Sequence, residues 1–440
     1  MKAKILPIIV DELNEKEERL KNFVFYKWVD FLPPLKIQNI NEWHRLPENV
    51  NNFDIDALLF FGGYWNDLDP LKQIKKPILI WSLTEGESLS MWKWEIIHWL
   101  KANGVKILSA ISGDRLRTYL RALATVRCIK GGKIGVFLYE PINKTHFAWG
   151  FEKVKQCIKK AGLEVEESDR KEIEILIKKL SDGEVKEKVI NRFNSIDNKI
   201  FKGVDEKYII ESFKLYLALK RIIDAKKYLG ISIDCLNRPF YGENDVPIHP
   251  CLAFSLLSDE GILCSCEGDY VTTATMIILS KFLNEPCFMT NIYPLSIWPA
   301  VAEHLGIEMP PYDPKTHVLL CHCAFLGVVP PSISKKFSIV KKEDKTHRDG
   351  VMVDAEIESG PVTIVKLSPT FESIQVILGY LKNIYRFSAL HCRAGGIVEV
   401  KDAINVAENL YSQHMVVFHN DRREDIKILS DVMNIKYEEL

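Results

Sequence analysis

The chain has 440 residues, of which 47% are hydrophobic and 27% charged, a balance typical of a globular protein with roughly two to four domains. Its formal net charge of -1 excludes an overall field that attracts nucleic acid or an anionic membrane, so we expect neither as a partner. No apolar stretch approaches the roughly 20 residues of a membrane span, and Pro7 interrupts the N-terminal apolar run, so we expect a cytoplasmic protein.

The first 125 residues alternate between strand-like and helix-like patterns. Short apolar segments predict buried strands at 3–10, 57–61, 77–81 and 105–108. Two further segments predict helices, at 90–102 and 114–125. This alternation predicts a parallel sheet and an N-terminal α/β domain over residues 1–128. Gly62 and Gly63 follow a strand directly, which indicates either a tight turn or a ligand site at the sheet edge.

A second α/β domain is predicted over residues 132–300, after a glycine-containing linker at 128–133. Its expected strands are 133–138, 231–235, 262–267 and 287–292. Its expected helices are 149–161, 171–180, 206–229, 251–257 and 271–283. Neither α/β domain contains the glycine-rich loop of dinucleotide or nucleotide sites, so the sequence gives no sign of such a ligand.

The composition changes at the prolines of residues 310–314, and a β-rich, barrel-like domain is predicted over residues 312–440. Its expected strands are 317–325, 336–341, 351–357, 361–367, 397–400 and 414–418. Helices are expected at 372–382, 402–411 and 423–434. The sequence therefore predicts an α/β protein with two parallel-sheet domains followed by a barrel-like one.

Ten cysteines include two closely spaced pairs, Cys264 with Cys266 and Cys321 with Cys323. Residues two apart on a strand share a face, so we favour buried, reduced, metal-free thiols. The alternative is a structural zinc site made from both pairs, although paired zinc ligands are usually separated by two to four residues. A disulfide framework is not expected in a chain of this length without a secretion signal.

Reactive side chains coincide with predicted strand ends in three places. Glu267 stands where a strand stops, so its carboxylate is expected at the sheet edge, whereas Asp269 is expected to cap the next helix. His322 lies in an apolar strand, and His414 and His419 flank the final strand. On pattern alone, buried core histidines are the favoured interpretation and metal ligands the alternative. One glutamate with two histidines would suit a divalent cation such as Mn²⁺.

Other side chains with a possible affinity for sugars or anions lie outside these three places. Trp92 and Trp94 present flat aromatic faces that suit the C–H surfaces of sugars, although burial in the core is the favoured interpretation. Arg393 offers a cation for an anionic group.

The segment 249–294, HPCLAFSLLSDEGILCSCEGDYVTTATMIILSKFLNEPCFMTNIYP, resembles part of the fucose/arabinose isomerase superfamily. In that part a glutamate is followed by a leucine-rich helix and a metal-site strand. LLCHCAF at 319–325 resembles the family's downstream His–Cys strand. SQHMVVFHNDRRED at 412–425 resembles its terminal segment with a metal histidine. The motifs occur in the family's order within about residues 230–430.

The resemblance implies two Rossmann-like domains, a C-terminal barrel and a homo-oligomer, either a trimer or a hexamer. It implies an aldose–ketose isomerisation of a small sugar or sugar derivative through an enediol, with Mn²⁺ or another divalent metal. Glu267 would be a metal ligand and would transfer the proton, and His322 and His414 would be further ligands. The alternatives are another carbon-acid enzyme, such as an epimerase or a lyase, and a non-catalytic sugar-binding protein.

The chain departs from the family at Asn291, where a second acid is usual. An amide can bind a cation through its oxygen but cannot accept a proton, so Asn291 is expected to be a metal ligand and not a base. Asp269 is the second candidate for a catalytic residue, and Asp354 and Glu356 are the other acids that could substitute.

Overall fold

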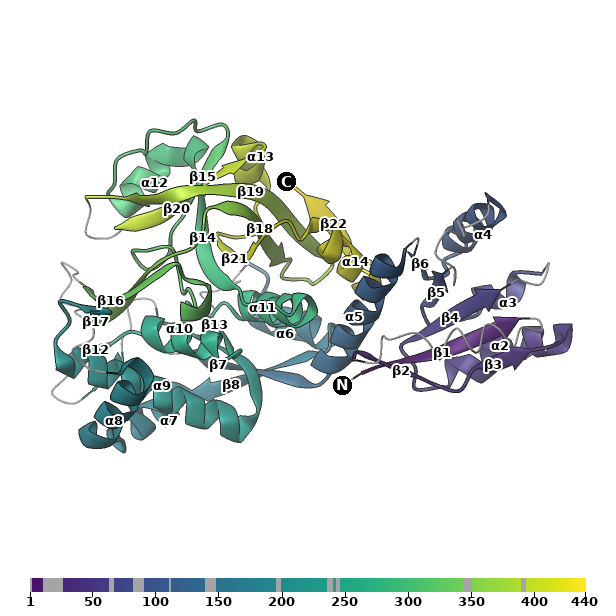
Figure 1. Cartoon of the computed structure of the whole chain (residues 1–440), viewed down its shortest axis with the longest axis horizontal. Helices are drawn as coiled ribbons and strands as arrows, with labels where there is room; N and C mark the ends of the chain where they lie inside the picture. The colour runs from purple at the N-terminus through teal and green to yellow at the C-terminus, as the bar shows by residue number, and fades with distance from the viewer. Residues whose placement is uncertain are drawn as a thin grey trace. The chain divides into compact units, whose positions relative to one another are not determined.

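The computed structural model describes residues 2–10, 27–62, 67–81, 91–110, 112–138, 148–194, 199–235, 240–242, 246–342, 350–388 and 393–440 (Figure 1). The chain divides into two compact units. The first comprises Met1–Lys130 and Asp425–Ile435, and the second comprises Gly131–Glu424 and Lys436–Leu440. The first boundary lies within the predicted linker. No helix in the described ranges is long and apolar enough to span a membrane.

The first unit is built on a parallel sheet in the order β2-β1-β4-β5-β6, with β3 also paired to β1. Its strands are β1 (Ala3–Val10), β2 (Val29–Phe31), β3 (Leu35–Ile37), β4 (Ala57–Gly62), β5 (Ile78–Trp81) and β6 (Ile107–Ala110). The helices are α2 (Ile40–Asn51), α3 (Asp69–Lys72), α4 (Met91–Ala102), α5 (Gly113–Ile129) and most of α14 (Arg423–Met433). The strands are almost continuously apolar because both faces of a parallel sheet are covered.

The tryptophan prediction for this unit is wrong where it can be checked. Trp94 in α4 is 61% exposed and is not a core residue. The side chain of Trp92 lies outside the described residues, as do Gly63 and Ile111. Trp43 in α2 is the buried tryptophan of this core, and its Nε1 donates a 2.7 Å hydrogen bond to the carbonyl of Asp67.

The second unit begins with a parallel sheet in the order β13-β10-β7-β8. Its strands are β7 (Gly132–Leu138), β8 (Leu163–Asp169), β10 (Tyr228–Ile233) and β13 (Leu263–Ser265). The helices are α6 (Phe151–Lys160), α7 (Arg170–Lys178), α8 (Asp182–Phe193), α9 (Glu206–Lys226), α10 (Cys251–Asp259) and α11 (Tyr270–Leu283). A small sheet pairs β11 (Phe240–Tyr241) with β12 (Pro247–Ile248). In a second one, β16 (Lys336–Lys342) lies between β9 (Phe201–Lys202) and β17 (Gly350–Glu356).

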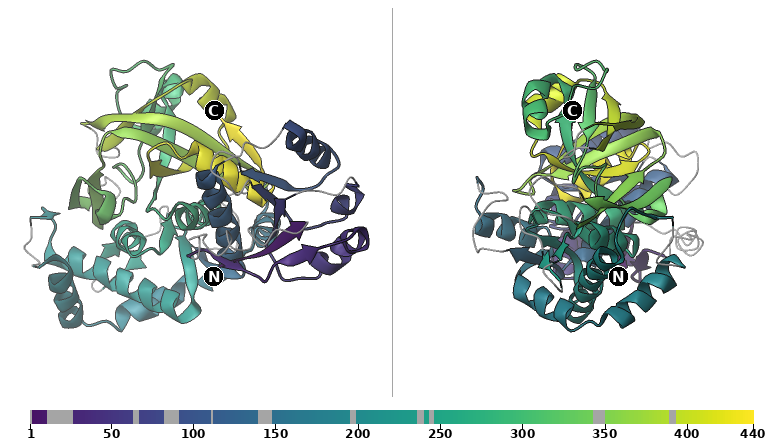
Figure 2. Two further views of the ribbon diagram at one scale, coloured as in Figure 1. Left: turned by 45° about the vertical axis from the view of Figure 1, so that its right-hand side comes forward. Right: turned by 90° about the vertical axis from the view of Figure 1, so that its left-hand side faces the viewer.

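A closed antiparallel barrel completes the second unit. Its strands lie in the green to yellow part of the ribbon in Figure 2. Its strand order is β18-β21-β14-β15-β20-β19, and pairing of β19 with β18 closes the ring. The strands are β14 (Phe288–Pro294), β15 (His317–Leu320), β18 (Gly360–Leu367), β19 (Ser373–Arg386), β20 (Ala394–Val400) and β21 (His414–His419). Strand β22 (Lys436–Glu439) adds in parallel to β19. The remaining helices are η2 (Leu295–Ile297), α12 (Trp298–Leu305), η3 (Pro331–Ile333) and α13 (Ala403–Asn409). The predicted fold class is confirmed.

Two element predictions in this unit are wrong. The segment 372–382 was expected to be a helix and forms most of strand β19, which has β18 on one side and β20 on the other. The segment 287–292 was expected in the second parallel sheet, but β14 is a barrel strand with antiparallel neighbours on both sides. The predicted separation between a second and a third domain stays a prediction, because both parts lie within one compact unit.

Candidate functional site

Three of the predicted site residues meet inside the second unit. Glu267 follows strand β13, His322 follows β15, and His414 opens β21. Each offers a carboxylate oxygen or a ring nitrogen, and these atoms all lie within 4.8 Å of one another. The parallel sheet contributes the carboxylate and the barrel contributes both imidazoles, so the cluster forms where these two parts of the unit adjoin.

Asn291 reaches this cluster by a route that differs from the prediction. The segment 287–292, which contains Asn291, was expected to be a strand of the same α/β domain as the strand that ends at Glu267. Instead, β14 lies in the barrel and pairs Asn291 directly with His414 of β21. The barrel register therefore brings the amide and the imidazole together.

His414 connects two carboxylates and is only 2% exposed. Its Nδ1 donates a 2.9 Å hydrogen bond to Asp269 Oδ2, and its Nε2 lies 3.3 Å from Glu267 Oε2. No described group forms a well-oriented hydrogen bond with this buried Nε2. Because Nδ1 carries the donated proton, the lone pair of Nε2 faces Glu267 when the ring is neutral.

His322 is held by a tight turn and by an amide. The turn runs from His322 to Phe325, with positive φ angles at its two central residues, 53° at Cys323 and 70° at Ala324. His322 Nδ1 lies 3.1 Å from Asn291 Oδ1, and Asn291 Nδ2 donates a 2.8 Å hydrogen bond to the hydroxyl of Tyr293. Since the oxygen of the amide faces the ring, Nδ1 is the donor. No described residue forms a well-oriented hydrogen bond with the buried Nε2, although the Cys323 thiol adjoins the ring.

Asp269 lies behind His414 in a buried polar network. As predicted, it caps the following helix, since Oδ1 accepts a 2.8 Å hydrogen bond from the backbone N–H of Thr272. Its Oδ2 accepts from the Thr272 hydroxyl at 2.7 Å and from Lys366 Nζ at 2.8 Å, in addition to His414. Lys366 is fully buried and also contacts the hydroxyl of Thr272. The network fixes the orientation of the His414 ring.

Glu267 occupies a backbone conformation that L-residues rarely adopt. Its φ is 59° and that of Gly268 is 67°, so two successive residues are left-handed between β13 and α11. Backbone hydrogen bonds hold this turn: Gly268 N–H donates to the carbonyl of Ile233 at 3.0 Å, and Glu267 N–H contacts Cys235 Sγ at 3.5 Å. Backbone strain of this kind is concentrated at functional sites.

The carboxylate and the imidazoles of the cluster each shift the pKa of the other toward its charged form. Burial alone would raise the pKa of Glu267, but the imidazoles of His414 and His322 lower it below its ordinary value. Burial alone would lower the pKa of His414, but Asp269 and Glu267 raise it. Burial also opposes protonation of His322, whose pKa is nevertheless raised to about 9 by Cys323 and Glu267. Glu267 is therefore ionised at neutral pH.

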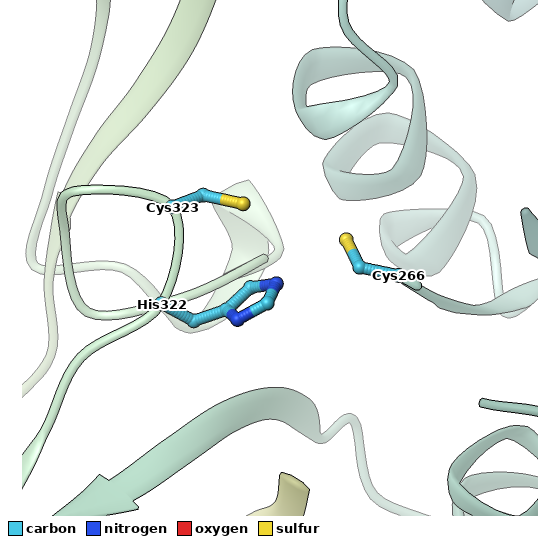
Figure 3. Close-up of side chains that lie close together, drawn as sticks. All are labelled: Cys266, His322 and Cys323. Atoms are coloured by element: carbon cyan, nitrogen blue, oxygen red, sulfur yellow. The ribbon is translucent and has the colours of Figure 1, made fainter. Parts of the chain in front are cut away.

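A group of thiols adjoins the same histidine. Cys266 Sγ, Cys323 Sγ and a ring nitrogen of His322 all lie within 4.8 Å of one another, and Figure 3 shows the three side chains directed toward a common space. Cys235 is hydrogen-bonded to Cys266, and Cys251 is hydrogen-bonded to Cys323. The hydrogen bonds from Cys251 and Cys266 lower the pKa of Cys323.

The sequence interpretation did not foresee this group. Cys323 lies in a turn beyond the end of β15, so the assumption that Cys321 and Cys323 share one strand face is wrong. Cys264 and Cys321 are buried outside the group, and no two described cysteines form a disulfide. Cys235 could have indicated the group from the sequence. It follows β10 as Cys266 follows β13, and because these strands are parallel neighbours the two thiols lie at the same sheet edge.

The other candidate residues have partners elsewhere. Asp354 and Glu356 accept hydrogen bonds from Arg386 at 3.1 and 2.8 Å, so these acids do not replace the one missing at Asn291. The guanidinium of Arg393 donates to the carbonyl of Lys341 at 3.2 Å. An open groove of about 440 Å³ on the barrel is lined by eight residues, none of which belongs to the cluster: Pro361, Leu378, Gly379, Tyr380, Glu399, Val400, Lys401 and Asp421.

Among curated proteins, two sulfoquinovose isomerases are similar to this chain over most of its length. No family model matches. The sulfoquinovose isomerases of Priestia aryabhattai and Priestia megaterium (strain ATCC 12872 / QMB1551) are each 22% identical over 441 residues, covering 92% of this chain and 90% of each relative.

Solved structures add no argument about function or fold. A periplasmic solute-binding protein of an ABC transporter from Actinobacillus succinogenes 130z, with bound D-allose, is 15% identical, and the match covers 64% of this chain and 93% of that one at a TM-score of 0.17. Salmonella D-lactate dehydrogenase is 12% identical, with 63% and 95% covered at a TM-score of 0.15. Both TM-scores are too low to indicate a shared fold.

Proposed function

We propose that this chain is an isomerase that interconverts the aldose and ketose forms of a sugar or sugar derivative, with a divalent metal such as Mn²⁺. The observation that carries the proposal is the convergence of Glu267, His322 and His414 within 4.8 Å. The similarity to two sulfoquinovose isomerases supports both the reaction type and the sugar substrate, because it extends over 92% of the chain.

The residues present fit a metal ion. The Nε2 atoms of His322 and His414 are buried and form no well-oriented hydrogen bond with the described groups, and a ligand bond to a cation would satisfy both. Together with the carboxylate of Glu267, they form a nitrogen and oxygen donor set that suits borderline divalent cations. These three residues would hold the ion, which when bound polarises the substrate oxygens as a Lewis acid.

Asn291 prepares His322 for this role. Its Oδ1 accepts from Nδ1 of the ring, so Nε2 is the nitrogen whose lone pair is free for the cluster when the ring is neutral, and its Nδ2 is held by Tyr293. The second lone pair of Oδ1 is compatible with the predicted ligand role. We propose that orienting His322 is the main contribution of Asn291.

Glu267 is the residue that we propose to move the proton. It is ionised at neutral pH, and its side chain keeps 22% exposure, so it can meet a substrate from solvent. In an aldose–ketose isomerisation a base takes the proton from C2, and the same group returns it to C1 of the enediol. Asp269 is 1% exposed and both of its oxygens have donors, so we propose that it positions His414.

The test uses the full chain with Mn²⁺ and a panel of aldoses that includes sulfoquinovose, incubated in deuterated water. We expect a ketose product and the incorporation of deuterium at C1 or C2 of the sugar, both measured by NMR. Glu267→Gln should lower the rate at least about 100-fold because it removes the base. Glu399→Gln, which changes an exposed carboxylate paired with Lys382, is the matched control and should keep the activity.

Two results would contradict the proposal. Absence of both isomerisation and exchange with every sugar, in protein shown to contain Mn²⁺, rejects the isomerase. Undiminished activity after complete removal of metal by a chelator rejects the metal dependence.

A further inference from the structure

We propose that a second, sulfur-rich metal site adjoins the carboxylate–histidine cluster and takes a thiophilic cation such as Zn²⁺. Its central ligands are Cys266, Cys323 and His322, whose sulfur and nitrogen atoms all lie within 4.8 Å of one another. In Figure 3 the thiol of Cys266 faces the imidazole of His322 and the thiol of Cys323, which come from one turn of the chain. Zn²⁺ in proteins is bound by this combination of thiolate and imidazole.

The spacing of these atoms is close to that of a bound zinc ion. With Zn–S bonds of about 2.3 Å in a tetrahedron, two thiolates on one zinc lie roughly 3.8 Å apart. The three donor atoms lie within 4.8 Å, so a contraction of no more than about 1 Å brings them to that spacing.

Two further cysteines, one beside Cys266 and one beside Cys323, could supply the fourth ligand of the zinc ion. Cys235 is hydrogen-bonded to Cys266, and Cys251 is hydrogen-bonded to Cys323. Either thiol completes a set of three cysteines and one histidine, which is a common structural zinc set. The thiols release their protons to the solvent as the sulfur–metal bonds form, and no oxidant or reductant takes part.

A second observation separates this group from ordinary buried cysteines. Thiols in a core usually behave as small apolar side chains. Here a histidine that is 3% exposed lies beside them, and no well-oriented hydrogen bond reaches its Nε2 from the described residues, although the Cys323 thiol adjoins the ring. A buried nitrogen lone pair next to two thiols costs free energy unless a proton or a metal ion occupies the space between them.

His322 belongs to both ligand sets, and this part of the inference rests on the proposed function. Its Nδ1 is committed to Asn291, so Nε2 is the one nitrogen that remains for a metal. Because one lone pair binds one cation, a zinc ion held by the thiols removes His322 from the set with Glu267 and His414. A thiophilic cation should therefore displace Mn²⁺ and stop isomerisation, and a chelator should reverse the effect.

The direct test is titration of Cd²⁺ into the metal-free, fully reduced protein, followed by the ultraviolet thiolate-to-cadmium charge-transfer band. We expect one equivalent to produce the band in the wild type. The double variant Cys266→Ala/Cys323→Ala should lose the band and bind at least about 100-fold more weakly, because two direct ligands are gone. Cys264→Ala and Cys321→Ala are matched controls, since each removes a buried thiol two residues away, and both should keep the band.

Three results overturn the proposal or its parts. A wild type without the band, or controls that lose it as fully as the double variant, rejects the sulfur site. If the double variant does not fold, the single variants Cys266→Ser and Cys323→Ser serve, and unchanged band intensity in both rejects the site equally. Mn²⁺ that stays bound at full Cd²⁺ occupancy, measured by electron paramagnetic resonance, rejects the sharing of His322.

The two proposals fail separately. Glu267→Gln should weaken Mn²⁺ binding and leave the cadmium band intact. A protein that shows the band and binds no Mn²⁺ therefore contradicts the proposed function while supporting the sulfur site.

Discussion

Glu267, the residue that we propose to move the proton, has an unfavourable backbone conformation. Its φ of 59° belongs to the left-handed region, which costs an L-residue roughly 1–2 kcal/mol relative to its preferred conformations. The turn is held in place by hydrogen bonds to Ile233 and Cys235 from the neighbouring strand segment. The fold therefore tolerates a strained residue at the carboxylate of the proposed site.

This strain can be measured by comparing Glu267→Gly with Glu267→Ala. Both variants lack the carboxylate, so the difference between them reports the backbone conformation. We expect the glycine variant to be the more stable by about 1 kcal/mol in denaturant unfolding, the reverse of the order in a regular helix or strand. An alanine variant of equal or greater stability would show that the turn carries no strain.

Asn291→Asp tests the departure from the fucose/arabinose isomerase pattern. The new carboxylate would face His322 and add a negative charge beside the proposed metal ligands. We expect about tenfold tighter Mn²⁺ binding by calorimetry, equivalent to about 1.4 kcal/mol. Weaker binding would instead show that the neutral amide is the better partner for His322. Tyr293→Phe, which removes only the hydroxyl that holds the amide, is the control for loss of orientation.

The sequence identified the reactive residues of the cluster but not the side chains that hold them in place. Glu267 and His414 were detectable because each stands at the end of an apolar strand and within a family motif. The partner of His414 was also named, but for a different role: Asp269 was expected to cap a helix and to act in catalysis. Lys366 was not detectable, because one charged residue in an apolar strand shows no sign of a carboxylate 97 positions away.

Helix α11 and barrel strand β18 are joined by a buried ion pair. Asp269 at the start of the helix and Lys366 on the strand are 2.8 Å apart, and each side chain is at most 2% exposed. Burial lowers the pKa of Lys366, and Asp269 opposes that change. A buried pair of this kind holds two elements in register, because neither charge can be left without the other.

Lys366→Met should therefore destabilise the protein by about 3–5 kcal/mol, since it leaves Asp269 buried without its cation. The double variant Lys366→Met/Asp269→Asn should recover part of this loss in denaturant unfolding. Lys382→Met is the matched control: its pair with Glu399 is exposed, so the change should stay within about 0.5 kcal/mol. Full additivity of the two buried substitutions would contradict the coupling.

The element predictions failed where tertiary pairing overrides the local pattern. Segment 372–382 contains an apolar spacing that also suits a helix, but hydrogen bonding to a strand on each side determines that it forms β19. Gly379 fits this strand because a Cβ there would lie 2.3 Å from a side-chain carbon of Val398. Helix α2 was missed because Pro47 lies inside it, and an internal proline usually argues against a helix.

The molecule as a whole follows the predicted class, because alternating strands and helices leave few alternatives to a parallel sheet. The assignment of a segment near the C-terminus to the first compact unit could not be predicted from the sequence. The chain leaves the first unit after Lys130, returns to it at Asp425 and leaves again after Ile435. Helix α14 was foreseen as a local element at 423–434, but local periodicity carries no information about which unit receives it.

Residues 1–130 expressed alone should therefore fold poorly. That fragment loses three contacts to the returning segment: Lys106 Nζ with the carbonyl of Val432, Tyr119 with Asp431, and Arg121 with Asp425. We expect rapid proteolysis and a broad thermal transition. Fusing residues 425–435 through a flexible linker should restore a cooperative transition, and a scrambled 425–435 segment is the control. A fragment that melts cooperatively by itself would contradict this expectation.

The returning helix also imposes an order on synthesis. The roughly 300 residues between Lys130 and Ile435 take about 15–60 s to translate at 5–20 residues per second. During that interval the first sheet to leave the ribosome lacks its last helix, while the barrel can close once β21 has emerged at His419. The first unit is thus synthesised first but receives its last helix late. We expect chaperones to bind the apolar surface that this helix has not yet covered on the nascent chain.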